Sequence, residues 1–310
     1  MIPALKKSDM AQVAAVASRD TTRAHLFASE MDIPQSYGDY QALLDDDEID
    51  VVYIPLPNHL HKEWTLRAAE AGKHILCEKP LALDAKECRE MIAGAQANGV
   101  QLVESFMYRH HPRILAAKEM VRSGMIGEIR TIESAFTFKL ENADDIRYQP
   151  EMGGGALMDV GCYCVNLSRL MAGREPITVQ ARAVWAQSGV DDQLTGILDF
   201  GEGLIAHFDC GFNQTRRQRA IVAGSLGYLD LPEVFSPGSS GSDIHEHKPG
   251  RPPRIHAYEG VDQYRLIAED FMRAIEGHPT TFPPEDAVAN MLTIQALLDS
   301  AQQDGQPVDL

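Results

Sequence analysis

A lysine, a carboxylate and a phenol occupy positions from which they could share proton-transfer chemistry. Lys79 lies near the end of the segment HILCEKP, residues 74–80, where an apolar strand runs out. Asp159 and Tyr163 lie in the segment GGGALMDVGCYC, residues 153–164, and their four-residue spacing places both on one face of a helix. If the three groups converge on one cleft, they form a proton relay suited to carbonyl and alcohol chemistry.

The residues around Lys79 leave two interpretations open. Most lysines are solvated, and Lys79 can be a surface residue. In a crevice, it could instead donate to a substrate hydroxyl or polarise a carbonyl, and its charge would lower the pKa of a neighbouring phenol. Pro80 keeps the backbone of Lys79 out of the helical region, which helps to fix the direction of the side chain. Glu78 either orients the lysine or only caps the strand.

Spacing alone does not assign a catalytic role to the other two groups. Tyr163 is, on spacing alone, better explained as an amphipathic core aromatic. A phenol with an unperturbed pKa near ~10 needs a neighbouring cation to work at neutral pH, and Lys79 is the candidate. Asp159 can serve only to cap the helix that follows the glycines at 153–155.

The composition excludes several classes of protein. The chain has 310 residues, 44% of them hydrophobic, which suits two domains. Its 45 acidic and 28 basic residues give a formal charge of −17, a surface that repels nucleic acids and anionic membranes. The five cysteines lack the spacing of a disulfide or zinc framework, and no apolar run reaches the ~20 residues of a membrane helix. We therefore expect a cytosolic protein with reduced thiols.

Strands and helices alternate in the first third of the chain. Near-continuous apolar strands separated by helices predict a parallel sheet covered on both sides. The clearest buried strand is DVVYIPLP, residues 50–57, with Asn58 as a helix cap. The other expected strands are at 13–18, 74–78 and 100–105, with helices at 21–31, 59–71 and 84–98.

The pattern changes after Tyr108. A helix at 112–123 and a long strand at 128–139 precede the glycine-rich segment. Successive strands then follow without helices, which predicts an antiparallel sheet; they are expected at 177–188, 193–200, 203–212, 217–223 and 226–231. Residues 236–254, rich in Gly, Ser and Pro, are expected to form an exposed loop, and two helices end the chain. We expect one domain over 1–108 and a second over 109–310.

The chain carries a set of motifs in a defined order: residues 50–58 with His61, Glu78-Lys79-Pro80, residues 106–109, and residues 153–157 leading to Asp159, Gly161 and Tyr163. In this order and spacing, they resemble the motifs of the glucose–fructose oxidoreductase, inositol dehydrogenase and rhizopine-catabolism family of oxidoreductases. The resemblance covers essentially the whole chain and, within the family, is strongest to NADP-dependent dihydrodiol and sugar dehydrogenases. It implies an α/β fold, with a Rossmann-type doubly wound parallel sheet followed by an α+β domain with an open antiparallel sheet.

One departure from the family is large. Its members begin with a strand and a Gly-x-Gly-x-x turn that seats the cofactor pyrophosphate at a helix N-terminus. Here residues 1–7 look like the end of that first helix. The strand is central in the doubly wound order, so its loss would leave two unpaired edges inside the sheet. We therefore expect a truncated start, which the upstream reading frame would complete.

The resemblance implies a dinucleotide along the carboxyl ends of the parallel strands. Ser18 and Arg19 follow the strand at 13–18, and a small polar residue before arginine suits the 2′-phosphate of NADP, although Asp20 nearby leaves NAD possible. Alternatively, Ser18 and Asp20 only cap the next helix. The other residues that the resemblance implies as cofactor contacts are Pro57, Asn58, His61, Glu78, Lys79 and Arg109. Arg109 could equally pair with an acid at the domain hinge.

The implied reaction is hydride transfer between NADP(H) and a secondary alcohol or carbonyl of a sugar, cyclic polyol or trans-diol. In it Tyr163 exchanges the proton, Lys79 assists and Asp159 binds a substrate hydroxyl. The open sheet commonly mediates dimerisation in the family, so the resemblance implies a homodimer or higher oligomer. A non-catalytic sensor with the same fold is the alternative, favoured by the missing glycine turn. His245 and His247 lack further ligands nearby in sequence, so we expect no metal site.

Overall fold

Parallel strands and helices alternate in the first part of the chain. The computed structural model describes residues 1–238 and 241–310. The strands are β1 (Ala15–Ala17), β2 (Gln35–Tyr37), β3 (Val51–Ile54), β4 (His74–Glu78) and β5 (Leu102–Ser105). The helices are α1 (Ile2–Leu5), α2 (Thr21–Glu30), α3 (Tyr40–Leu44), α4 (His61–Glu70) and α5 (Ala85–Ala97). All ladders among these strands are parallel, as the alternating pattern predicted.

Local signals in the sequence account for the boundaries of these helices. Asp20, Asp39 and Asp84 are extended at the N-caps of α2, α3 and α5, and each carboxylate accepts from a backbone N–H of the first turn. After α4, Gly72 adopts φ +73°, a left-handed conformation that ends a helix with little strain in glycine. These residues thus fix where α2, α3 and α5 begin and where α4 ends.

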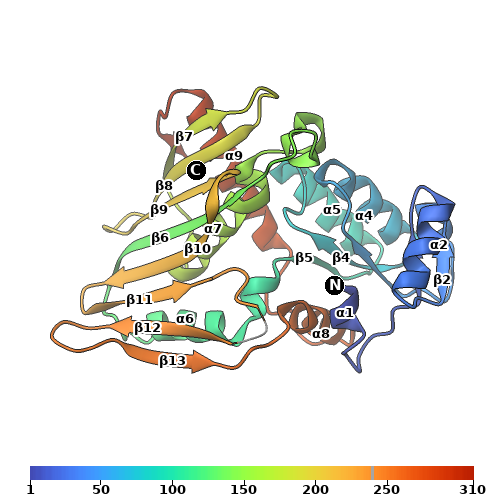
Figure 1. Cartoon of the computed structure of the whole chain (residues 1–310), viewed down its shortest axis with the longest axis horizontal. Coiled ribbons are helices and arrows are strands. Elements are labelled where there is room, and N and C mark those ends of the chain that lie inside the picture. The colour runs from blue at the N-terminus through green and yellow to red at the C-terminus, as the bar shows by residue number, and fades with distance from the viewer. Residues whose placement is uncertain (239–240) are drawn as a thin grey trace.

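The parallel strands form two sheets rather than one. β1 pairs with β2, and β3, β4 and β5 form a second sheet, with no ladder between β1 and β3 among the described residues. The edges of β1 and β3 are therefore unpaired among the described residues, as expected from the sequence. Figure 1 shows β2 and α2 at the right of the molecule, beside the sheet that carries β4 and β5.

The rest of the chain builds a nine-stranded mixed sheet in the order β13-β12-β11-β10-β6-β9-β8-β7-β14. Its strands are β6 (Ile129–Lys139), β7 (Thr178–Trp185), β8 (Asp191–Asp199), β9 (Ile205–Gly211), β10 (Asn213–Gly224), β11 (Gly227–Pro232), β12 (Ser242–His247), β13 (Arg254–Tyr258) and β14 (Val308–Asp309). The helices are α6 (Pro112–Arg122), α7 (Cys162–Ala172), α8 (Gln263–Ile275) and α9 (Glu285–Gln302). One face is covered, because α7 packs on β6 and β9, and α9 packs on β7.

The predicted antiparallel sheet is confirmed for most of its ladders, although β6 and β9 pair in parallel. One expectation about this sheet is wrong. The segment 236–254 is not a single loop, because β12 forms within it and pairs with β11 and β13. Residues 239–240, which the expected loop included, lie outside the described residues. The Gly, Ser and Pro residues flank this strand, so composition over the whole window concealed its alternating apolar and polar side chains.

The core is continuous between the two sheet systems. Apolar side chains of β4 and β5 belong to the same buried cluster as those of α7, β8 and β9. Phe106, Tyr108 and Tyr163 lie in this cluster, at the junction between the parallel sheet and the mixed sheet. Within the described residues, no helix combines the length and apolar character required to cross a bilayer.

Candidate active site

The pocket of interest lies where β4 ends against the glycine-rich turn and α7. It has a volume of about 590 Å³, within the roughly 300–1,000 Å³ of small-molecule sites. Lys79, Asp159 and Tyr163 all line it, as predicted from the sequence. Of the other residues that line the pocket, the sequence had indicated only Glu78 as a candidate for the site. The other lining residues are Tyr53, Glu78, Met107, Phe136, Phe138, Arg147, Val160, Arg216, Ser236 and Tyr264.

Lys79 is directed into this pocket and is largely buried. Its Nζ donates to the backbone carbonyl of Asp159 at 2.7 Å and to Oδ1 of the same residue at 3.1 Å. Burial opposes the charge on the lysine, but the carboxylate of Asp159 outweighs it, so the pKa of Lys79 is raised above its usual value. The lysine is therefore cationic and is not a solvated surface residue.

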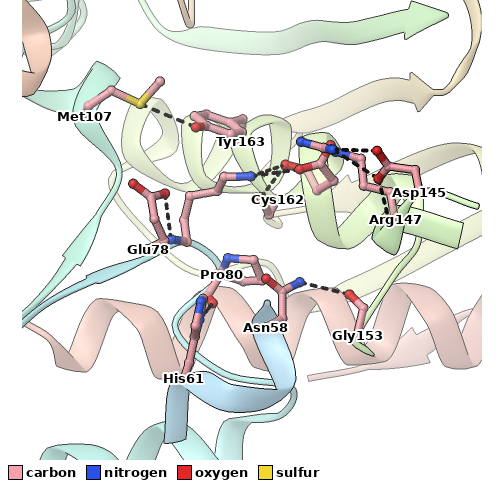
Figure 2. Close-up of polar contacts among 12 residues, drawn as sticks. Asn58, His61, Glu78, Pro80, Met107, Asp145, Arg147, Gly153, Cys162 and Tyr163 are labelled. Carbon is pink, nitrogen blue, oxygen red and sulfur yellow. Dashed lines mark hydrogen bonds and ion pairs between the residues drawn. The ribbon is translucent and has the colours of Figure 1, made fainter. Parts of the chain in front are cut away.

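Asp159 is held between two cations. Its Oδ1 accepts from Lys79, and its Oδ2 accepts from Nε of Arg147 at 2.7 Å. Burial alone would raise the pKa of this carboxyl, but Lys79 and Arg147 together lower it. Arg147 in turn is fixed by Asp145, with Nη1 3.2 Å from Oδ1, a contact visible in Figure 2. Asp159 is therefore a carboxylate at neutral pH.

The glycine-rich turn brings Asp159 to the pocket by close packing against the turn after β3 and against β8. Asn58, which follows β3, donates to the carbonyl of Gly153 at 2.9 Å (Figure 2). A Cβ on Gly155, whose φ is +116°, would lie 2.2 Å from Oδ1 of Asp191. Asp191 on β8 accepts from the N–H of Leu157 at 2.6 Å, and burial raises the pKa of this carboxyl to about 7.

Asp159 itself lies in a π-helical turn, Leu157–Gly161, immediately before α7. Such turns occur mostly as single-turn insertions and frequently at functional sites. The prediction that Asp159 and Tyr163 share one side of a helix is confirmed, because both line the same pocket. Asp159 does not act as the N-cap of α7, a position that Gly161 occupies.

The hydroxyl of Tyr163 points away from both charged groups. It donates to the sulfur of Met107 at 3.4 Å, whereas Nζ of Lys79 lies 5.1 Å from the centroid of the phenol ring. Figure 2 shows this orientation. Burial raises the pKa of Tyr163 well above its usual value, and Glu78 adds to the increase. The expectation that Lys79 lowers this pKa is wrong for the present geometry, because desolvation of the phenol dominates.

Glu78 caps its strand and does not contact the ammonium of Lys79. One oxygen accepts from the hydroxyl of Tyr53 at 2.6 Å, and the other accepts from the backbone N–H of Lys79 at 3.2 Å. Of the two alternatives left open by the sequence, the structure supports the cap. Tyr53 was not singled out, since an alternating strand pattern does not show which of its aromatics faces a pocket.

His61 is a structural residue here, and the sequence-based assignment to the cofactor is not supported for its side chain. The imidazole is fully buried, with Nδ1 3.0 Å from the carbonyl of Pro80 and Nε2 2.8 Å from the carbonyl of Leu56. Burial lowers the pKa of the ring. The side chain thus ties the turn after β3 to the turn after β4, as Figure 2 shows for Pro80.

Arg109 lies at the hinge, as the alternative interpretation held, and not in the pocket. Its buried guanidinium forms an ion pair with the partly buried Asp286 of α9 at 2.5 Å and lies over the ring of Phe282, 4.4 Å from its centroid. Asp286 also binds Arg169 of α7 at 2.8 Å. The guanidinium of Arg109 thus joins η2 (Met107–His110) to α9 and does not line the pocket.

Ser18, Arg19, Pro57 and Asn58 lie at the carboxyl ends of parallel strands, as expected. Ser18 follows β1, and its Oγ accepts from the N–H of Asp20 at 3.4 Å, while Asp20 caps α2. Arg19 is exposed. Pro57 and Asn58 form the turn after β3, with Asn58 bound to the glycine-rich turn.

His245 and His247 lie on β12, with Asp230 of β11 opposite His245. Potential ligand atoms of these three residues lie within 4.8 Å of one another. The carboxylate of Asp230, however, is engaged by Arg219 at 2.8 and 2.9 Å. A metal ion would have to compete with this bidentate pair.

Comparison with known proteins agrees with this architecture over nearly the whole chain. The family model described as an oxidoreductase family with an NAD-binding Rossmann fold matches residues 1–106, and that of the GFO/IDH/MocA C-terminal domain matches residues 114–230. The D-xylose 1-dehydrogenase (NADP(+)) 2 of Haloferax volcanii is 38% identical over 313 residues, covering 100% of this chain and 95% of that protein.

Two further proteins show the same likeness. The trans-1,2-dihydrobenzene-1,2-diol dehydrogenase of Mus musculus is 35% identical over 227 residues, which cover 73% of this chain and 68% of that protein. A 3-ketoreductase from Actinomadura kijaniata, in complex with NADP and TDP-benzene, has a similar structure, with a TM-score of 0.91 and 31% identity over 96% of this chain and 92% of that chain. The protein therefore belongs to the GFO/IDH/MocA family of oxidoreductases with an NAD-binding Rossmann fold.

Proposed function

We propose that the protein transfers hydride between NADP(H) and a secondary alcohol or carbonyl group of a sugar, a cyclic polyol or a trans-diol. The observation that carries the proposal is the meeting of Lys79, Asp159 and Tyr163, from distant parts of the chain, in one pocket at the carboxyl end of β4. Relatives named as a sugar dehydrogenase and a diol dehydrogenase support the substrate class.

The residues at the strand ends fit a phosphorylated dinucleotide. The guanidinium of Arg19 has no ion-pair partner within residues 1–238 and 241–310 and suits a 2′-phosphate. Asp20 is engaged as a helix cap, which reduces its capacity to hold the ribose hydroxyls of NAD. Pro57, Asn58 and Glu78 would border the nicotinamide end. When bound, NADP(H) supplies the hydride chemistry, and the protein supplies orientation and charge.

Tyr163 is the proposed proton donor to a substrate carbonyl. Its raised pKa keeps the phenol protonated at neutral pH, and the weak bond to Met107 can be exchanged for one to the substrate oxygen. The ammonium of Lys79, 5.1 Å from the ring centroid, would stabilise the phenolate left behind. Asp159 holds that ammonium beside the ring and can accept from a neighbouring substrate hydroxyl.

The lining of the pocket suits a ring that carries hydroxyl groups. Phe136, Phe138 and Tyr264 offer aromatic surface against the C–H face of a sugar or the apolar ring of a diol. Arg216 and Ser236 offer polar contacts along the same wall. An uncharged ligand is favoured because Arg216 is already paired with Glu233 at 2.6 Å and Arg147 with Asp159 at 2.7 Å.

The proposal is tested by mixing the purified protein with NADP and D-xylose, other aldoses or a trans-dihydrodiol, and by following NADPH absorbance. The reverse reaction is followed with NADPH and the corresponding ketones or lactones. We expect turnover with NADP and slower turnover with NAD. Dinucleotide binding, measured by NADPH fluorescence, without turnover of any substrate would contradict the proposal and support the non-catalytic sensor.

We further propose a homo-oligomer formed through the uncovered face of the nine-stranded sheet. Five large apolar side chains are exposed on this face, namely Val184, Ile197, Ile205, Tyr228 and Ile255. Exposed apolar patches of this kind mark protein contacts. A cytosolic location is supported by five buried, unpaired cysteines. We place the domain boundary between Tyr108 and Arg109, where the parallel sheet has ended and the hinge ion pair begins.

A further inference from the structure

The turn that carries Lys79 is held by side chains from other elements. The carbonyl of Pro80 is bound by His61 of α4 at 3.0 Å, and the N–H of Leu81 donates to Oε1 of Glu104 at 2.8 Å. Both partners are buried, with 0% and 4% of the residue exposed. The peptide group between Pro80 and Leu81 is therefore held at both its carbonyl oxygen and its N–H, while the ammonium of Lys79 is held by Asp159.

Glu104 is the unusual member of this set, because a carboxylate in the interior is costly unless it is well bound. It lies on β5, whose residues are all buried. Only Oε1 has a hydrogen-bond partner; Oε2 is buried and has none among the described residues. The nearest compensating charges are Arg109 and Arg169 of the hinge, opposed by Asp286. An apolar side chain would pack at this position without the cost of a buried charge. The presence of Glu104 therefore needs an explanation other than packing.

We propose that Glu104 is a positioning residue for the reaction: by binding the N–H of Leu81, its carboxylate fixes the turn from which Lys79 reaches Asp159 and Tyr163. The inference rests on the proposed function of the pocket. Glu104 lines no part of that pocket and acts only through the lysine. A hydrogen bond to a carboxylate is shorter and stronger than one to a neutral group, so ionised Glu104 holds the turn more firmly than the neutral acid.

This role makes the rate depend on pH near neutrality. Burial raises the pKa of Glu104 to about 7, although Arg109, Arg169 and the N–H of Leu81 counteract the increase. The other titratable groups coupled to it are Asp286 of α9 and the thiols of Cys77, Cys88 and Cys162, whose pKa values burial raises. As the pH falls through about 7, Glu104 takes up a proton, its bond to Leu81 weakens, and turnover should decline.

The test compares Glu104→Ala and Glu104→Gln with the same two changes at Glu246, a glutamate of similar burial on β12, remote from the pocket. With NADP and D-xylose between pH 5.5 and 8.5, we expect Glu104→Ala to lower kcat by ~10- to 100-fold, with KM for NADP within about threefold of the original. Glu104→Gln keeps an acceptor without a charge, so its kcat should be intermediate and should lose the inflection near pH 7. Both Glu246 variants should keep that inflection.

Hydrogen exchange at the amide of Leu81 gives a readout that needs no turnover. Glu104→Ala should speed this exchange at least ~10-fold, while distant amides of β8 stay unchanged. Unchanged exchange, or an unchanged kcat in Glu104→Ala, overturns the inference, as does a Glu104→Gln profile that retains the inflection. If the unaltered protein turns over no substrate, the proposed function fails, and the exchange experiment still decides whether Glu104 fixes the turn.

Discussion

At the scale of single residues, the site is a chain of charges rather than three independent groups. Arg147 binds Asp159, Asp159 binds Lys79, and Lys79 lies over the ring of Tyr163. Each member therefore depends on its neighbour for its position and charge. This arrangement supports the proposed role of Tyr163 as an acid despite its raised pKa. The ammonium of Lys79, which would stabilise the phenolate, is already held beside the ring before the proton is transferred.

Removing the ammonium of Lys79 or the hydroxyl of Tyr163, the two groups of the proposed proton transfer, should lower kcat strongly. We expect Lys79→Ala and Tyr163→Phe each to lower kcat by ~10²–10⁴-fold, the usual contribution of an acid–base group. Tyr258→Phe on β13 and Lys118→Ala on α6 are the matched controls, since neither residue lines the pocket. Steady-state rates decide the question, and activity in both site variants close to that of the controls would refute the assignment.

Arg147, which the sequence did not single out, should behave as a positioning residue. Arg147→Ala removes one of two cations beside Asp159, so the pKa of this carboxyl should rise and Lys79 should be held less firmly. We expect kcat to fall by ~10-fold or more, with part of the loss restored in Arg147→Lys. Arg174→Ala is the control, because Arg174 is a partly buried arginine in the turn after α7 that does not line the pocket. An equal effect of the two alanine variants would contradict this role.

Sequence reasoning found Lys79, Asp159 and Tyr163 because strand ends and helical spacing determine where side chains gather. It could not indicate the buried position of the His61 side chain, because a polar residue after a strand can turn inward to carbonyls as readily as outward to a ligand. It missed Arg147 because this residue lies in a single 3₁₀ turn, Ile146–Tyr148, which is too short for periodicity to indicate the direction of a side chain. The orientation of the Tyr163 hydroxyl depends on Met107, a tertiary contact that spacing does not reveal.

At the scale of elements, the glycine-rich turn sets the geometry of the site. It presses against Asn58 at one glycine and against Asp191 at another, and the π-helical turn then presents Asp159. The local sequence predicted a turn and a helix here. It could not predict the π-helical insertion, because that feature depends on Asp191, which arrives from β8 more than thirty residues later.

Gly155→Ala tests this packing. The change introduces strain at φ +116° and places a Cβ 2.2 Å from Oδ1 of Asp191. Gly189→Ala is the matched control, because its φ is +94° but no atom lies within 4 Å of the new Cβ. Denaturant unfolding should show a loss of about 1–2 kcal/mol for the control and about 1–3 kcal/mol more for Gly155→Ala. Only Gly155→Ala should also reduce kcat; equal losses of stability would contradict the packing argument.

At the scale of the whole molecule, helices cover one face of the large sheet, and the other face carries exposed apolar side chains among the described residues. The sequence predicted an antiparallel sheet here, but a single chain does not determine what meets its exposed face. If that face joins two copies, Ile197→Glu or Ile205→Glu should shift the mass measured by light scattering toward the monomer. Leu115→Glu, on the exposed side of α6, should not. A monomeric unaltered protein would refute the interface.

The division of the parallel strands between two sheets has a consequence for how the molecule melts. Among the described residues, β1 and β3 share no ladder. No backbone hydrogen bonds between strands therefore join the lobe of β1, β2 and α2 to the sheet of β3, β4 and β5. On heating, this lobe should open before the remainder, so the loss of structure would be a two-step event in a calorimetric trace. If NADP contacts Arg19 and Asn58 as proposed, it bridges both lobes and should merge the two steps. A single sharp transition without NADP would show that the lobe unfolds together with the rest.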